Sequence, residues 1–167
     1  VRETWNRDKR VEEILKKNKC KWQQFQRDGI IRGIKNRESW DKRWYTNAHE
    51  PVIENTYSPQ LIEFEHPFPL QSKLKDEIVS YPNDFQKPGQ QFAWKYLISF
   101  CQERGKDYSF KISKPLESRK SCSRISPYLA WGNLSIKQAY QFVKHHENYA
   151  NHKRSFNGFL TRLKWHC

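Results

Sequence analysis

Prolines gather in the middle of the chain and separate two stretches of different character. Six of the eight prolines lie within residues 49–88. Proline lacks an amide proton and biases the residue before it away from helical conformation, so long helices are disfavoured here, although a brief one is predicted over residues 74–80. The chain is therefore predicted to have three parts: a domain over residues 1–48, an interdomain linker over residues 49–87 and a second domain over residues 88–167.

The first part alternates helical and extended patterns. Apolar residues at helical spacing predict a helix over residues 2–17, and the short apolar run at residues 21–25 predicts a strand. A second helix follows, with Trp44 and Ala48 on one face. Alternation of this kind is typical of the edge of an α/β layer.

The second part is predicted to be all-α. After Pro88, apolar residues at helical spacing predict a helix that ends at the Arg104–Gly105 pair. Residues 106–125 read as an irregular loop, and Ser126 with Pro127 opens a short helix. Ser135 is the predicted cap of the next helix, and a final helix begins near residue 151. The chain as a whole is therefore predicted to be mostly α.

Composition favours a folded protein with an anionic partner. The net charge is +13, from 31 Lys and Arg against 18 Asp and Glu, and 15% of the residues are aromatic. Nucleic acid is the commonest partner of such a surface, while the high aromatic content excludes a disordered basic tail. The four scattered cysteines form no CxxC pair, which favours a reducing cytoplasmic location. No run approaches the roughly 18 apolar residues that span a membrane.

Two features have the chemistry of a binding site. The serine- and arginine-rich segment SRKSCSRIS, residues 118–126, precedes a predicted helix, where backbone amides and the helix dipole favour a phosphate. In the last helix, Trp165 lies off the apolar stripe, with Arg162 one turn earlier and His166 beside it, as in a platform for stacking a base. The histidines at 145, 146 and 152 lack a second ligand pair and are interpreted as solvated, not as a metal site.

One motif resembles a known family. SCSRISPYLAWGNLS, residues 121–135, is similar to the flavin-domain signature of DNA photolyases and cryptochromes, and the family's order of landmarks extends from Glu3 through Pro88 to Trp165. The chain contains no methionine and begins at Val1, so it is expected to be an internal piece of a longer protein. By the resemblance, that piece comprises the end of the α/β antenna domain, the linker and the first helices of the all-α FAD-binding domain.

The resemblance implies a cofactor, a partner and their contacts. The intact protein would be a monomer that binds FAD and DNA carrying pyrimidine dimers, with a folate or deazaflavin chromophore in the missing part of the antenna domain. Reduced FAD, excited by light, would pass an electron to the dimer, so no side chain of this chain is expected to be catalytic. The expected flavin contacts are Tyr108, Cys122, Ser123, Arg124, Ile125, Ser126 and Phe159, and the expected lesion contacts are Arg162, Trp165 and His166.

Some residues depart from the family pattern and leave alternatives open. Arg162 stands where many members carry a glutamate, His166 replaces an arginine, and Ile112 replaces another arginine that contacts phosphate. A cryptochrome that binds FAD and signals without repair is therefore the first alternative. The second is a basic helical module that binds nucleic acid without any flavin.

Overall fold

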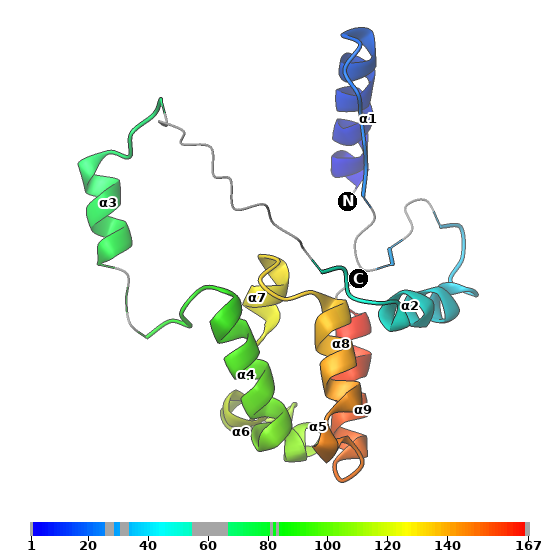
Figure 1. Ribbon diagram of the computed structural model, residues 1–167, viewed down its shortest axis with the longest axis vertical. Coiled ribbons are helices and arrows are strands. Elements are labelled where there is room, and N and C mark those ends of the chain that lie inside the picture. Colours follow the sequence, from blue (N-terminus) through cyan, green and yellow to red (C-terminus); the bar gives the residue numbers. More distant parts are fainter. Residues whose placement is uncertain are drawn as a thin grey trace.

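The structure is a computed structural model that describes residues 2–25, 29–30, 34–54, 67–80, 82 and 84–165, and it is mostly helical (Figure 1). No strand occurs among these residues. The elements in chain order are α1 (Arg2–Lys17), α2 (Trp40–His49), α3 (Ser72–Val79), α4 (Gln90–Gln102), η1 (Arg104–Asp107), α5 (Tyr108–Lys111), α6 (Pro115–Ser121), α7 (Ser126–Ala130), α8 (Ile136–His145), η2 (Glu147–Tyr149) and α9 (Lys153–Lys164).

The first part of the chain confirms one prediction and contradicts another. Helix α1 spans the predicted residues, but its apolar residues Val11 and Ile14 are exposed. The strand predicted over residues 21–25 is wrong, because the structure has irregular backbone there. A strand is stable only beside another strand that takes up its backbone hydrogen bonds, and the described part of the chain offers none.

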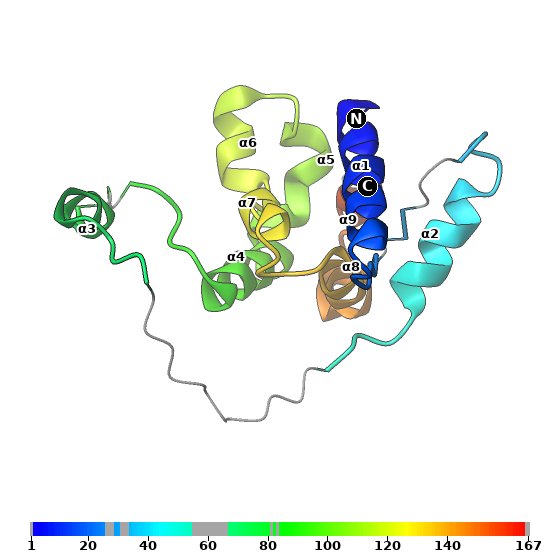
Figure 2. The ribbon, with the colours of Figure 1, turned by 90° about the horizontal axis from the view of Figure 1, so that it is seen from above.

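Helix α3 stands by itself in the proline-rich middle of the chain. It matches the brief helix predicted near residues 74–80, and none of its residues is buried. Its ribbon lies away from the other helices in Figures 1 and 2. The rest of the predicted linker falls partly on residues 55–66, 81 and 83, which lie outside the described residues.

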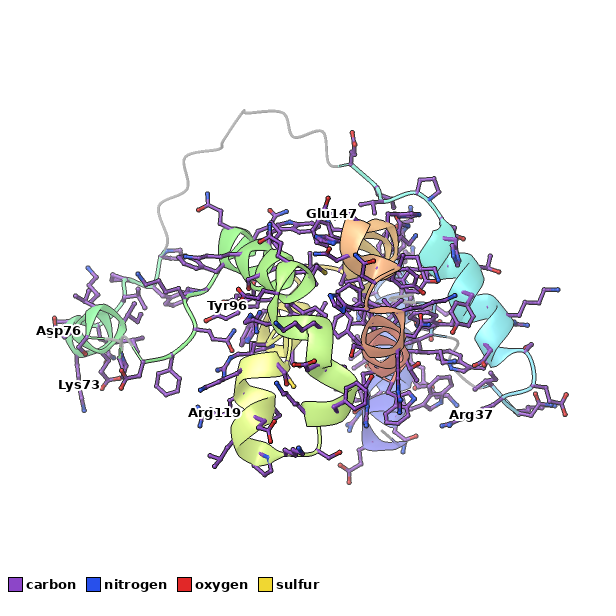
Figure 3. The ribbon with its side chains drawn as sticks, turned by 90° about the horizontal axis from the view of Figure 1, so that it is seen from below. Arg37, Lys73, Asp76, Tyr96, Arg119 and Glu147 are labelled. Carbon is purple, nitrogen blue, oxygen red and sulfur yellow. The ribbon has the colours of Figure 1, made fainter. Side chains whose placement is uncertain are left out.

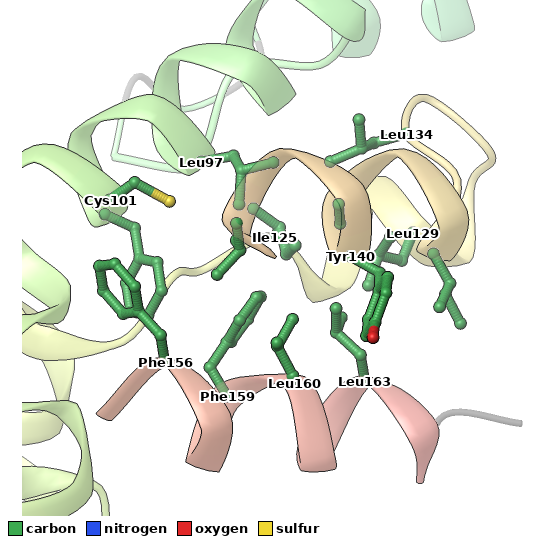
Figure 4. Packing of buried hydrophobic residues seen from close by; sticks show 14 of the residues in the cluster. Leu97, Cys101, Ile125, Leu129, Leu134, Tyr140, Phe156, Phe159, Leu160 and Leu163 are labelled. Atoms are coloured by element: carbon green, nitrogen blue, oxygen red, sulfur yellow. The ribbon is translucent and has the colours of Figure 1, made fainter. Parts of the chain in front are cut away.

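The hydrophobic core forms where α4, α8 and α9 meet. Helix α9 turns Phe156, Phe159, Leu160 and Leu163 inward, at the spacing of its predicted stripe, and Figure 4 shows them pointing towards the residues of α4, α7 and α8. Each of these four side chains is less than 10% exposed. Burial of a side chain of this size contributes about 1.5–3 kcal/mol, so this stripe is a main source of stability.

Helix α2 closes the core from the far side of α8. Trp44 is 2% exposed, and its ring meets that of Tyr140 edge to face at a centroid distance of 5.4 Å. Gln141 of α8 donates hydrogen bonds to the carbonyls of Ala48, at 2.9 Å, and Glu50, at 2.7 Å. Seen from above in Figure 2, α2 lies outside α8 and α9, opposite to α4. Residues from both sides of the proline-rich stretch therefore share one core.

The predicted phosphate-binding segment, residues 118–126, runs from the end of α6 to the start of α7. Helix α8 begins as predicted at Ser135, whose hydroxyl accepts from the Gln138 amide at 3.0 Å while the Gln138 side chain accepts from the Ser135 amide at 2.9 Å. The irregular loop predicted over residues 106–125 is wrong, because α5 and α6 lie within it. Helix α6 starts with Pro115 in its first turn, where the missing amide proton is not needed.

Candidate functional site

The serine-rich turn of residues 122–126 connects α6 to α7 and is fastened by Arg104 of η1. The Arg104 Nε donates to Ser99 Oγ at 3.1 Å, and Nη2 donates to the Tyr96 carbonyl at 2.7 Å. The same guanidinium donates to the carbonyl of Cys122 through Nη1 and to that of Ser123 through Nη2 at 3.4 Å. A planar group with five donors thus joins the turn to the end of α4.

Residues 86 and 87 hold the other side of the turn. The side-chain Nε2 of Gln86 donates to the Arg124 carbonyl at 2.9 Å, and Arg124 Nη2 donates back to Gln86 Oε1 at 3.4 Å. The Tyr128 hydroxyl donates to the Lys87 carbonyl at 2.7 Å. Arg124 has a φ of +60°, which costs free energy in a residue other than glycine and is maintained here by bonds on both sides.

The side chains of the turn alternate between core and surface. Ser123 and Ile125 are buried, Cys122 and Arg124 are half-buried, and Ser126 is exposed. Burial raises the pKa of the Cys122 thiol, against the opposing effect of the positive charges of Arg104 and Arg124. The reachable groups of the turn are therefore Cys122, Arg124 and Ser126.

Tyr108 and Phe159 are buried and pack against each other in the core. Their ring centroids are 6.0 Å apart with the planes nearly perpendicular, and Phe100 packs against both. Burial raises the pKa of Tyr108 to about 12; the Cys122 thiol adds to the increase and the Arg162 charge opposes it. The phenol is therefore neutral at physiological pH and lies within electrostatic reach of both the turn and α9.

The last turn of α9 presents Trp165 to the solvent. This side chain is 63% exposed, whereas Leu163 of the same turn is 2% exposed, which confirms the predicted position off the apolar stripe. The guanidinium carbon of Arg162 lies 4.2 Å from the centroid of the indole ring. Lys164 fixes this end of the helix to α2 through an ion pair with Asp41 at 2.9 Å. The predicted contact His166 lies outside the described residues.

The structure brings four of the predicted site residues together from distant parts of the sequence. Cys122 of the turn raises the pKa of Tyr108 and Arg162 of α9 lowers it, and Phe159 packs on Tyr108. Ser123 and Ile125, also predicted flavin contacts, point into the core, so only their backbone groups can serve a ligand at this turn.

Sequence reasoning missed the residues that fasten the turn. Arg104 was expected to be a basic residue that ends a helix, and Gln86 falls within the predicted linker. An arginine followed by glycine after an apolar helix is a common sequence, so the pattern carries no sign of its contacts with Cys122 and Ser123.

Two further findings concern metals and membranes. The described residues include no group of three or more His, Cys, Asp or Glu side chains arranged to hold a metal ion. His146 instead accepts a hydrogen bond from the Asn148 amide at 3.2 Å through Nδ1. None of the described helices is both long enough and apolar enough to cross a membrane.

Comparison with known proteins yields no relative of this chain. No protein-family model, no curated protein and no solved structure matches it. The resemblance to photolyases and cryptochromes therefore rests on the sequence motif at residues 121–135 and its flanking landmarks, and it stays a prediction.

Proposed function

We propose that this chain is part of a light-dependent, FAD-containing DNA photolyase that splits pyrimidine dimers. The observation that carries the proposal is that Tyr108 and Phe159 pack on each other, with ring centroids 6.0 Å apart, in the core against which Cys122 also packs. These residues come from three separate segments, and each occupies a position that the motif resemblance assigns to flavin or lesion contact.

The groups around the turn fit an anionic cofactor. Arg124 and Arg104 bring positive charge to the turn, and Ser126 is exposed at the start of α7. Cations and hydroxyls of this kind bind phosphate well. The Tyr108 phenol and the Cys122 thiol would add neutral donors beside the cofactor. When bound, reduced FAD would supply the electron that opens the cyclobutane ring.

Trp165 is the proposed platform for the damaged base. A base must leave the duplex stack before chemistry can reach it, and an exposed indole replaces part of the stacking that is lost. Arg162 covers part of one face of the ring and places a positive charge beside it. The pair therefore offers stacking and attraction to the DNA backbone at one point.

Arg162 also favours a second candidate, a cryptochrome that binds FAD but does not repair DNA. An arginine cannot accept the hydrogen bonds that a glutamate accepts from a lesion. Blue-light-dependent loss of dimers from damaged DNA distinguishes the two functions. A protein that binds flavin and leaves the dimers intact would support the cryptochrome and contradict the photolyase.

The experiment uses the full-length protein that contains this chain, purified with its flavin. We expect repair of dimer-containing DNA under blue light and much weaker repair by Trp165→Ala. Trp22→Ala is the control, because Trp22 is exposed and lies outside both the motif of residues 121–135 and the proposed site. Equal repair by both variants would remove Trp165 from the site.

A separate measurement tests the expected extent of the flavin pocket. Residues 1–167 contain one proposed wall of that pocket, so we expect the isolated chain not to retain FAD firmly. Absorbance near the flavin bands after gel filtration measures this retention. A stoichiometric yellow product would contradict the expectation. Salt-dependent DNA binding without flavin or lesion preference would instead favour the basic nucleic-acid-binding module.

A further inference from the structure

A pocket with many charged residues in its lining includes Arg124 of the serine-rich turn. It has a volume of about 490 Å³ and is bordered by α4, η1, α5 and α6. Of its 11 lining residues, six are basic and three are acidic. Figure 3 shows two of the lining residues, Tyr96 and Arg119, on the same side of the helices. The basic residues are Arg104, Lys106, Lys111, Arg119, Lys120 and Arg124.

Two of the acidic residues are already paired. Asp107 forms an ion pair with Lys111 at 2.9 Å, and Glu117 pairs at 3.2 Å with Lys114, which does not line the pocket. Within the described part of the chain, no carboxylate lies at ion-pair distance from Lys106, Arg119 or Lys120. The third acidic residue, Glu103, also lines the pocket, so six basic residues stand against three acidic ones and the lining has an excess of positive charge.

Two of the lining arginines, Arg104 and Arg124, are held in place by neutral partners. Hydrogen bonds to three backbone carbonyls and to a serine hydroxyl fix Arg104, using four of its five N–H donors. Arg124 is fixed by Gln86. The pKa of Arg104 is lowered, first by burial and also by the positive charge of Arg124, so the two guanidiniums repel each other. Negative charge bound in the pocket would relieve this repulsion.

The size and lining of the pocket indicate the class of ligand. A volume of 490 Å³ falls within the range of roughly 300–1,000 Å³ typical of small-molecule sites and exceeds what a lone phosphate needs. Tyr96, the aromatic residue of the lining, is half-buried and supplies an apolar ring beside the cations. Basic groups for phosphate beside a ring for stacking are the features that bind a nucleotide.

We propose that this basic pocket binds the phosphate groups of a nucleotide. The pocket shares Arg104 and Arg124 with the proposed phosphate contacts of the flavin, whereas Tyr108, Phe159 and Trp165 do not line it. The phosphates could belong to a free nucleotide or to the backbone of a nucleic-acid strand. Arg119 and Lys120 are the exposed residues that would first meet either ligand.

The test measures binding by the 167-residue chain in the dark without flavin. One arm uses a fluorescent ADP analogue and the other a fluorescein-labelled ten-thymidine strand, both followed by anisotropy. We expect the double variant Arg119→Glu/Lys120→Glu to weaken binding about tenfold or more, because charge-assisted contacts to phosphate are lost. The control Lys42→Glu/Lys153→Glu makes the same charge change at exposed sites outside the pocket and is expected to alter affinity less than about twofold.

The two arms separate the sources of phosphate. Saturable binding of the ADP analogue that depends on Arg119 and Lys120 supports a free nucleotide, whereas such binding of the strand alone assigns the phosphates to nucleic acid. Equal losses in the test and control variants, or no binding in either arm, would overturn the proposal. Circular dichroism checks that each variant is folded. The variant Arg119→Gln/Lys120→Gln removes the charge without reversing it, so its loss of affinity should lie between those of the control and of the glutamate variant. Flavin retention and repair by the full-length protein are measured separately, so either proposal can fail alone.

Discussion

Replacing Arg104 by alanine should loosen the turn of residues 122–126 and lower the stability of the whole helical core. The guanidinium donates to the carbonyls of Tyr96, Cys122 and Ser123 and to the Ser99 hydroxyl. A hydrogen bond from a charged donor contributes about 1.5–3 kcal/mol net, but bonds made by one group are not additive. Because Arg104 is only half-buried, water can replace part of the loss, and we expect a decrease of about 3 kcal/mol in the free energy of unfolding.

Urea denaturation followed by far-ultraviolet circular dichroism measures this decrease. Arg104→Lys should recover about half of it, since an ammonium keeps the charge but cannot reproduce the planar fork. Arg119→Ala, which removes an exposed arginine from neighbouring α6, is the matched control and should change stability by less than about 0.5 kcal/mol. In a double-mutant cycle, Arg104→Ala and Ser99→Ala should couple by about 0.5–1.5 kcal/mol.

The outcome that would refute this reasoning is a loss below about 1 kcal/mol for Arg104→Ala, the range of an ordinary surface contact. In that case the turn would be held by Gln86 and Tyr128 alone, through their bonds with Arg124 and Lys87.

Three further predictions concern lesion binding, pH and packing. In the flavin-loaded full-length protein, Trp165→Ala should weaken affinity for dimer-containing DNA by about 1–3 kcal/mol in a gel-shift titration, and an unchanged affinity would contradict the platform. The pKa of Tyr108 rises from 10.0 to about 12 on folding, so its contribution to stability is complete below pH 10 and is lost as pH rises to 12. Tyr108→Phe should therefore reduce the slope of stability between these values in urea titrations; an identical slope would refute burial of the phenol. A Cβ at Gly105 would lie 2.7 Å from Phe100 Cε2 and from the Phe100 carbonyl oxygen. Gly105→Ala should therefore lower the free energy of unfolding, measured by thermal denaturation, by about 1–3 kcal/mol. An unchanged free energy of unfolding would show that the site has free space.

Helices with a strong apolar period or a clear cap could be predicted from the sequence. Helix α1 spans the predicted residues, and α8 begins at Ser135 because a serine with a glutamine three residues later satisfies two amides at once. Helix α5 could not be found, because a single turn has no period to detect. Helix α6 did have a signal, since Pro115 with Glu117 in the first turn is typical of a helix start.

The strand prediction failed for a different reason. A short run of apolar residues satisfies the local preference for a strand, but a strand forms only where a second strand supplies hydrogen bonds. The sequence of five residues does not reveal whether such a partner strand exists. The exposure of Trp165 could be predicted, because the rotation per residue within a single helix places it off the apolar stripe. The packing of Tyr108 on Phe159, and of Cys122 against the same core, depends on how three segments meet, and no local pattern in the sequence predicts it.

The contribution of α2 to the core limits how this protein can be shortened. A version that starts at residue 88 would lack the indole of Trp44, leaving the ring of Tyr140 uncovered, and the Gln141 side chain would lose both carbonyl partners. Such a truncated product would present an apolar groove to water and tend to self-associate. Supplying residues 40–50 as a separate peptide should restore a single well-behaved species, so α2 belongs with α8 in any engineered minimal unit.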